Sequence, residues 1–197
     1  MTTPPNTPTP AGTVLLPRQM YFTTGTGAHP RELQAHDLMY MDAGLGRVNR
    51  VTVSSRVPPG CTLVDPETGG GQLRDGQILF AIQALAETNT PGTRIATAVG
   101  IAVPEDGSLG CVAEVHEDDA VGKDARTAAD KAVQMALLAM ALELGEHDFD
   151  ERAEHRSGQD RYSIAGTTVR THVVSVEAHG PDNGDWVKIV ASLVFLL

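Results

Sequence analysis

Two adjacent serines, Ser54 and Ser55, follow an alternating apolar and polar run and precede two prolines, Pro58 and Pro59. A serine hydroxyl that reaches the carbonyl carbon of its own preceding peptide bond can move that acyl group from nitrogen to oxygen. The prolines restrict the backbone just downstream, which favours a geometry that keeps the hydroxyl near this carbonyl carbon. Elimination of the resulting ester and hydrolysis would leave a pyruvoyl group, an electrophilic ketone that can serve as the electron sink in amino-acid decarboxylation.

The serines belong to a longer segment, residues 42–60, with the sequence DAGLGRVNRVTVSSRVPPG. Its glycines, valines and prolines predict a turn, a strand over residues 47–55 and an abrupt stop. The segment closely resembles the processing site of the pyruvoyl-dependent arginine decarboxylases. Residues 103–114 resemble the stretch that leads to the catalytic glutamate of that family. The turn after Pro104 is one residue shorter than in the family, so the match is aligned on Gly110, with Glu114 four residues later. The resemblance extends from about Pro17 to the end of the chain.

This resemblance implies a chain that cleaves itself between Ser54 and Ser55 into residues 1–54 and residues 55–197, with Ser55 converted to a covalent pyruvoyl group. It implies the lyase reaction of that family, decarboxylation of L-arginine to agmatine and CO2 through an imine (Schiff base) on the pyruvoyl group, a step of polyamine biosynthesis. It also implies an α+β fold, a four-layer αββα sandwich, assembled as a homotrimer of cleaved protomers.

Four residues match positions with a role in the family. Glu114 matches the proton donor, and Asn49 matches an asparagine beside the pyruvoyl group, so both are expected catalytic residues. Asp37 matches the carboxylate that receives the guanidinium group, and Ser54 is the other expected substrate-binding residue. The residue types suit these roles, because a carboxylate accepts two parallel hydrogen bonds from a guanidinium and an amide both donates and accepts. A carboxylic acid among apolar neighbours suits proton donation near neutral pH, and the expected neighbours are Val112, Ala113 and Val115.

Other interpretations of the same residues stay open. Arg47 and Arg50 add two cations beside the serines, so an amino acid other than arginine is an alternative substrate. The chain could also be an unprocessed, non-catalytic relative that acts as a binding or regulatory subunit, in which the carboxylates and the asparagine are ordinary surface or strand residues. A serine hydrolase that uses Ser55 is disfavoured, because the sequence has no GxSxG motif.

Composition narrows the class of protein. With 197 residues and 41% hydrophobic content, the chain can bury the core of one domain. Its formal charge of −10 and its pI near 5.0 argue against a nucleic-acid partner. Cys61 and Cys111 are expected to be reduced and buried, and no signal peptide or membrane-spanning run is recognisable. The protein is therefore expected in the cytoplasm, without contact to a membrane.

The sequence also predicts a terminal tail, one domain and two helices. Residues 1–12 are expected to form a disordered tail rich in Pro and Thr, and residues 13–197 to form one decarboxylase domain. A helix is predicted over residues 30–41, with Asp37 at the border of an apolar face. A long helix over residues 125–144, N-capped by Asp124, is predicted to cover a sheet. The apolar face of the first helix comprises Leu33, Leu38 and Met41.

The rest of the chain is predicted to be strands and loops. The charged residues 146–162 have no metal-ligand spacing such as HExxH, so a solvated loop and no metal site are expected there. Asn183 and Gly184 predict a hairpin between the last two strands. The predicted strands are residues 19–24, 61–65, 78–85, 95–103, 110–115, 166–178 and 186–196, and a loop is predicted at residues 66–72.

Overall fold

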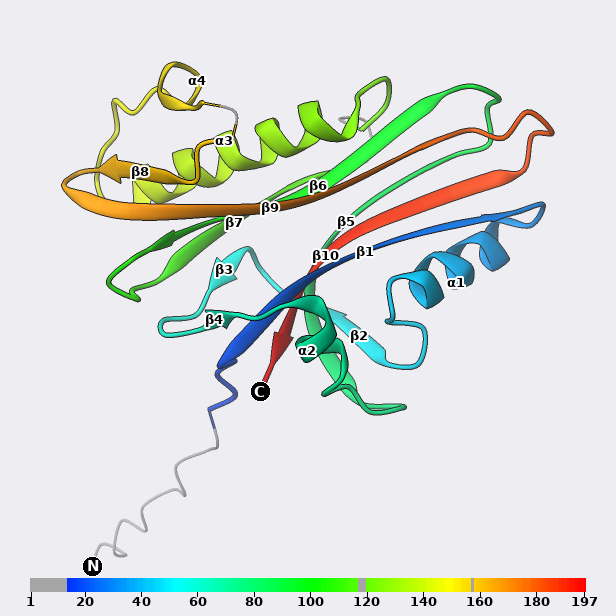
Figure 1. The fold of residues 1–197 in the computed structure, drawn as a ribbon, viewed down its shortest axis with the longest axis horizontal. Coiled ribbons are helices and arrows are strands. Elements are labelled where there is room, and N and C mark those ends of the chain that lie inside the picture. The colour runs from blue at the N-terminus through cyan, green and yellow to red at the C-terminus, as the bar shows by residue number, and fades with distance from the viewer. Residues whose placement is uncertain (1–13, 117–119, 157) are drawn as a thin grey trace, which may run out of the picture.

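The computed structural model describes residues 14–116, 120–156 and 158–197, so the expected tail over residues 1–12 lies outside the described residues. In the described part the fold is mixed α+β, with ten strands in two sheets and four helices (Figure 1). In chain order the elements are β1 (Gln19–His29), α1 (Glu32–Asp42), β2 (Asn49–Thr52), β3 (Arg56–Val57), β4 (Thr62–Leu63), α2 (Pro66–Gly70), β5 (Ile78–Thr88), β6 (Arg94–Pro104), β7 (Gly110–Val115), α3 (Ala125–Glu143), α4 (Glu151–Glu154), β8 (Arg161–Ile164), β9 (Thr167–His179) and β10 (Trp186–Leu196).

The two five-stranded sheets face each other across a shared core. One sheet, called here the β1 sheet, has the order β2-β5-β10-β1-β4, and the other, called the β6 sheet, has the order β3-β7-β6-β9-β8. Strands β6 and β10 are buried on both faces, and the continuous apolar sequence of β6 is typical of such burial. The buried side chains that join the sheets are Met20, Val57, Cys61, Ile82, Ala84, Val99, Ile101, Val112, Ala191, Leu193 and Phe195.

Helix α1 packs directly on the backbone of β1 at two glycines. A Cβ at Gly25 would lie 2.1 Å from the carbonyl oxygen of Met39, and a Cβ at Gly27 would lie 2.2 Å from that of Ala35. The strand predicted to end before these glycines continues through both, because the glycines admit a helix rather than stop the strand. The buried residues of α1 are Ala35, Met39 and Tyr40.

Helix α3 covers the β6 sheet, as the sequence predicts (Figure 1). The carboxylate of Asp124 accepts a hydrogen bond from the backbone N–H of Thr127, which caps the first turn of the helix. The C-terminal end of the helix, at Glu143, contacts Arg56 of β3. The side chains that α3 buries are Ala128, Ala132, Val133, Ala136, Leu137, Met140 and Ala141.

Residues 66–72, predicted as a loop, contain the short helix α2. The Asp65 carboxylate accepts a hydrogen bond from the backbone N–H of Thr68, and Pro66 occupies the first turn. Both are start signals of a helix, and they outweigh the three glycines that follow.

The hairpin predicted around Asn183 and Gly184 does not form. Strands β9 and β10 flank this turn but belong to different sheets, because β9 pairs with β6 and β8 while β10 pairs with β1 and β5. The turn therefore carries the chain from the β6 sheet to the β1 sheet. A turn sequence fixes the local reversal of the chain, but long-range pairing decides which strands become neighbours.

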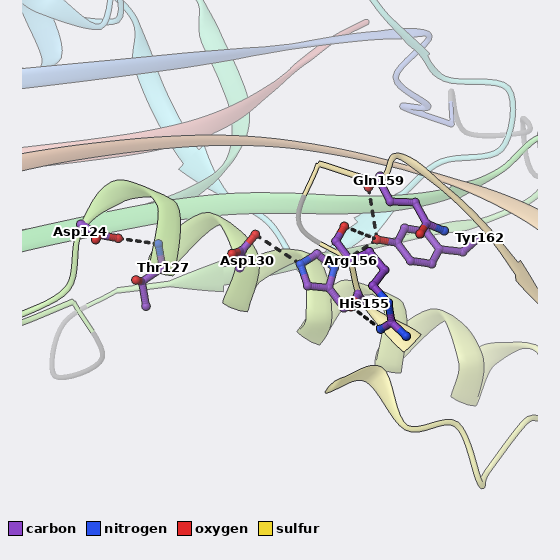
Figure 2. A network of polar contacts seen from close by, with 7 residues as sticks. All are labelled: Asp124, Thr127, Asp130, His155, Arg156, Gln159 and Tyr162. Atoms are coloured by element: carbon purple, nitrogen blue, oxygen red, sulfur yellow. Dashed lines mark hydrogen bonds and ion pairs between the residues drawn. The ribbon is translucent and has the colours of Figure 1, made fainter. Parts of the chain in front are cut away.

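The charged residues 146–162 are partly folded against α3, which corrects the prediction of a solvated loop (Figure 2). The side chain of His155 is only 7% exposed. Its Nδ1 lies 3.1 Å from the Tyr162 hydroxyl, and its Nε2 lies 3.3 Å from the Asp130 carboxylate of α3. These buried polar contacts attach α4 and β8 to α3, an attachment that charge density alone does not reveal.

Two further observations concern the described ranges as a whole. No helix in them is both long and apolar enough to cross a membrane. In the same ranges, no cluster of three or more His, Cys, Asp or Glu side chains has an arrangement that could hold a metal ion.

Candidate active site

Ser54 and Ser55 lie where the chain passes from one sheet to the other. Strand β2 ends at Thr52 in the β1 sheet, and β3 begins at Arg56 in the β6 sheet. The strand predicted over residues 47–55 is therefore wrong at its end, because a bend at Ser55 turns the backbone into the second sheet. Ser54 is exposed and Ser55 is half-buried, so the peptide bond between them belongs to neither sheet.

The Ser55 side chain contacts the carboxylate of Glu114. The Ser55 hydroxyl donates to this carboxylate, with Oγ at 2.9 Å from Oε1 and 3.1 Å from Oε2. The strand register explains the contact, since Arg56 pairs with Cys111 and the Val112 N–H donates to the Ser55 carbonyl oxygen at 3.1 Å. Ser55 thus lies opposite Val112, and Glu114 is two residues further along the same strand face.

The apolar surroundings of Glu114 are only partly those predicted. Val112 shares its strand face and belongs to the core between the sheets. Ala113 and Val115 point to the opposite face, where they pack under α3. Because side chains alternate along a strand, sequence neighbours cannot surround the same side chain. The half-buried Glu114 therefore faces the space between the sheets together with Ser55.

A backbone donor holds the carbonyl group that self-cleavage would attack. The Arg56 N–H donates to the Ser54 carbonyl oxygen at 2.8 Å, which closes a three-residue turn around Ser55. A donor at this oxygen stabilises the negative charge that develops when a nucleophile adds to the carbonyl carbon. The Ser55 hydroxyl thus contacts a carboxylate that can take its proton, and the adjacent Ser54 carbonyl is polarised by a backbone donor.

Gly110 allows β3 to approach β7 closely. A Cβ at this position would lie 3.0 Å from the Cβ of Val57 and 3.0 Å from the carbonyl oxygen of Ala102. Any side chain would push away the strand that follows Ser55. The glycine that anchors the resemblance over residues 103–114 therefore has a packing role in the site.

A pocket of about 390 Å³ opens beside the serines. Arg56 borders it, with Nη1 at 3.1 Å from the Glu143 carboxylate and 3.1 Å from the Cys111 sulfur. The sequence prediction missed Arg56 and Glu143, because they come together only when α3 packs on the sheet. The one available signal was the position of Arg56 next to Ser55. The pocket is lined by Ser54, Ser55, Arg56, Val112, Ala139, Leu142 and Glu143.

Arg47 and Arg50 are the two cations that made an amino acid other than arginine an alternative substrate. Both bind other groups of the chain. Arg47 forms an exposed ion pair with Asp75. The guanidinium carbon of Arg50 lies 3.4 Å from the centre of the Tyr40 ring, and its Nη1 donates to a backbone carbonyl at 2.8 Å. Neither arginine lines the pocket beside Ser55.

Asn49 and Asp37 are not brought to Ser55 within the described chain. Asn49 begins β2 at the end remote from the serines, is exposed, and donates from Nδ2 to the Gly76 carbonyl at 2.8 Å. Asp37 is exposed on α1, which packs on the β1 sheet through a separate core cluster. Of the expected site, one chain assembles the two serines and the glutamate.

The apolar face predicted for α1 lies on its outer side. Leu33, Leu38 and Met41 are 65%, 41% and 65% exposed, and Asp37 is exposed among them. The docking of α1 at the glycines of β1 brings the face that carries Ala35, Met39 and Tyr40 to the sheet, which turns the three apolar side chains outward. An exposed cluster of this kind is typical of a surface that another protein covers.

Lys188 of β10 ties α1 to the β1 sheet. Its Nζ lies 2.9 Å from the Glu32 carboxylate of α1 and also pairs with Glu87 of β5. Burial works against the charged form of Lys188, but hydrogen bonds with Glu87 and Glu32 outweigh burial and raise the pKa of Lys188. This ion pair fixes the first turn of the helix that carries Asp37.

Comparisons with known proteins agree with these features. The family model of pyruvoyl-dependent arginine decarboxylase (PvlArgDC) matches residues 19–197. A pyruvoyl-dependent arginine decarboxylase of Methanococcoides burtonii is 35% identical over 184 residues, which cover 93% of this chain and 100% of that protein. Pyruvoyl-dependent arginine decarboxylase 2 of Methanosarcina acetivorans is 34% identical over 183 residues, with 92% and 98% covered. A probable pyruvoyl-dependent arginine decarboxylase of Chloroherpeton thalassium is 32% identical over 182 residues, with 92% and 98% covered.

Proposed function

The chain belongs to the pyruvoyl-dependent arginine decarboxylase family, and from this premise we propose that it converts L-arginine to agmatine and CO2. We propose that it first cleaves its own backbone between Ser54 and Ser55. The observation that carries this proposal is the contact between the Ser55 hydroxyl and the Glu114 carboxylate, beside a Ser54 carbonyl that already accepts a hydrogen bond.

Self-cleavage uses the Ser55 hydroxyl, the Glu114 carboxylate and the hydrogen-bonded carbonyl group of Ser54. Glu114 takes the proton of the Ser55 hydroxyl, and the oxygen adds to the carbonyl carbon of Ser54 while the Arg56 N–H stabilises the charge on the carbonyl oxygen. The C–N bond breaks, the nitrogen gains a proton, and an ester joins residue 54 to Oγ of residue 55. Loss of the α-proton and the ester oxygen frees Ser54 as a carboxylate. Water then converts the remaining dehydroalanine to the pyruvoyl group and releases ammonia.

The surroundings of residue 55 fit a pyruvoyl group. The Val112 N–H can keep its hydrogen bond to the carbonyl oxygen of residue 55. The serine side-chain carbon would become a methyl group, and the adjacent keto carbon, the former α-carbon of Ser55, would lie near Glu114. When formed, the pyruvoyl group supplies the electrophile and the electron sink that loss of CO2 requires. After cleavage, Glu114 no longer binds the Ser55 hydroxyl. It is then placed to hold the proton that the substrate α-carbon receives.

Asp37 and Asn49 are proposed to act across a boundary between copies of the chain, in a homotrimer of cleaved protomers. The support is the exposure of Asp37 among three exposed apolar side chains of α1, a surface that a second copy would cover. Asp37 of one copy would receive the substrate guanidinium through two hydrogen bonds. Asn49, exposed at the start of β2, and Ser54, at the new chain end, would complete the substrate site.

The proposal extends to the architecture and the compartment. The sequence of layers α1, β1 sheet, β6 sheet and α3 supports a four-layer αββα sandwich, with residues 13–197 as one decarboxylase domain after a tail over residues 1–12. Cys61 and Cys111 are free and buried, which supports a reducing compartment, the cytoplasm.

A decarboxylation assay without pyridoxal phosphate tests the function. Arginine, ornithine and lysine are offered separately to the purified protein, and CO2 and amine products are measured. Agmatine from arginine is the expected result. A preference for ornithine or lysine would contradict the substrate assignment. An uncleaved protein that acts on none of the three would instead support a non-catalytic relative.

A further inference from the structure

Cleavage before residue 55 would remove the covalent link between β2 and the reactive end of the chain. Residue 55 would then be held by β3, a strand of only two residues (Arg56–Val57) at the edge of the β6 sheet. Chain ends fray unless other contacts hold them. The new end therefore needs an anchor beyond the short pairing of β3 with β7.

The Arg56 side chain makes contacts of the required kind. Arg56 lies opposite Cys111 in the register of β3 and β7, so its side chain points to the face that α3 covers, while Ser55 points to the inner face. Its Nη1 is 3.1 Å from the Cys111 sulfur and 3.1 Å from the Glu143 carboxylate. One side chain thus joins the new chain end to a strand and to a helix.

Glu143 has its own reason to bind a cation. It is the last residue of α3, and the last turn of this helix has no basic residue. A carboxylate at a helix C-terminus is opposed by the helix dipole, and Arg56 supplies the missing positive charge. Burial raises the pKa of the Cys111 thiol despite the adjacent guanidinium, so at neutral pH the sulfur accepts the Arg56 hydrogen bond as a neutral thiol.

We propose that Arg56 is a positioning residue whose guanidinium, bound to Glu143 and Cys111, keeps residue 55 on Val112 and facing Glu114 after the backbone is cut. This inference rests on the proposed self-cleavage. Before the cut, β2 also holds Ser55, so the Arg56 side chain has little influence on cleavage itself. After the cut the clamp supplements the short pairing of β3 with β7, and its loss displaces the reactive group.

The test compares Arg56→Met with Arg56→Lys, Glu143→Gln and the control Arg47→Met, which breaks an exposed ion pair of the same kind. Intact mass gives the cleaved fraction, and kcat and KM are expressed per cleaved chain. For Arg56→Met and Glu143→Gln, the cleaved fraction is expected within about 2-fold of wild type. Their kcat is expected to fall roughly 10- to 100-fold at nearly constant KM, because a displacement of a reactive group by about 1 Å can lower kcat by that much. Arg56→Lys restores most of the lost kcat.

Hydrogen exchange supplies a readout independent of turnover. In the cleaved protein, peptides that contain the Val112 N–H are expected to exchange roughly 10-fold faster in Arg56→Met than in Arg47→Met, since this amide holds residue 55. Unchanged exchange, or a kcat no lower than that of Arg47→Met, overturns the clamp.

Two other outcomes separate the clamp from its premise. A rise in KM at constant kcat would assign Arg56 and Glu143 to substrate binding, and it would overturn the positioning role while the proposed function stands. A wild-type protein that stays uncleaved overturns the proposed function, and the clamp with it.

Discussion

Two parts of the proposed site differ in what surrounds them: one lies at the junction of β3 with β7, and the other on the exposed outer face of α1. At the junction, Ser55 and Glu114 touch because the register of two strands in one chain places them opposite each other. On α1, Asp37 is exposed among Leu33 and Met41, and a separate core cluster holds this helix on the β1 sheet. The first part is complete within one chain, and the second has an open surface.

In the proposed function, bond breaking and substrate recognition therefore have separate structural requirements. Under this proposal, the groups for self-cleavage need only the packing of β3 on β7, whereas Asp37 would reach a substrate guanidinium beside Ser55 only from a second copy of the chain. Changes to Ser55 and Glu114 at the junction should therefore affect both cleavage and turnover. Changes on α1 should affect turnover alone.

Replacement of the nucleophile should have the largest effect. Ser55→Ala removes the oxygen that attacks Ser54, so the protein is expected to stay as one chain and to show no decarboxylation. Mass spectrometry and CO2 release measure the two outcomes. Ser54→Ala, which keeps the nucleophile and the attacked carbonyl, is the matched control and should still cleave. A cleaved and active Ser55→Ala would contradict the role of the junction.

Glu114→Gln should follow in size. The amide can still contact the Ser55 hydroxyl but cannot take or deliver a proton, so cleavage and kcat are each expected to fall about 10²- to 10⁴-fold. The rate of appearance of the two chains and kcat per cleaved chain are measured. Glu105→Gln is the control, because Glu105 pairs with Arg161 and Arg170 instead. Normal cleavage by Glu114→Gln would remove this residue from the first step.

Asp37→Asn tests the other side of the comparison. Cleavage should proceed as in wild type, while kcat/KM for arginine falls roughly 10- to 100-fold, since a charged hydrogen bond contributes about 1.5–3 kcal/mol. Asp75→Asn is the control, because Asp75 is also an exposed carboxylate but pairs with Arg47 away from the serines. Slower cleavage in Asp37→Asn, or an unchanged kcat/KM, would contradict the division between the two regions.

Lys188→Met should have the smallest effect. The substitution leaves the Glu32 and Glu87 carboxylates without their cation, but both carboxylates are about half-exposed. The free energy of unfolding is therefore expected to fall by about 1–2 kcal/mol, and Tm by roughly 3–6 °C. Because the folded pKa of Lys188 is raised, its stabilisation is present below about pH 10.4 and is lost as the pH rises through the folded value. Thermal unfolding from pH 7 to 11 measures this, and equal pH profiles for variant and wild type would contradict it.

The elements whose formation depends on local sequence were predictable. The continuous apolar runs of β5 and β6 and the Asp124 cap of α3 are such signals, and the structure confirms them. The pairing partners of β9 and β10 were not predictable from Asn183 and Gly184, because a turn does not specify which sheet its strands enter. The outward direction of Leu33 and Met41 depends on glycines of β1 that no pattern within α1 reveals.

The candidate site divides in the same way. The roles expected of Ser55 and Glu114 rest on short motifs, and the structure brings these two side chains together. The pairing of Arg56 with Glu143 joins distant parts of the chain and became visible only when α3 had been placed on the β6 sheet. Asn49 and Asp37 remain predictions, because a single chain does not contain the surface that would bring them to residue 55.

The central claim is that this chain cuts its own backbone before residue 55 and leaves a keto group there. Intact-mass analysis of freshly purified protein, with and without borohydride, tests it most directly. The account predicts two polypeptides, residues 1–54 and residues 55–197, with the mass of a pyruvoyl group on the second and a shift of that mass after reduction. One unbroken chain whose mass borohydride does not change would contradict the account.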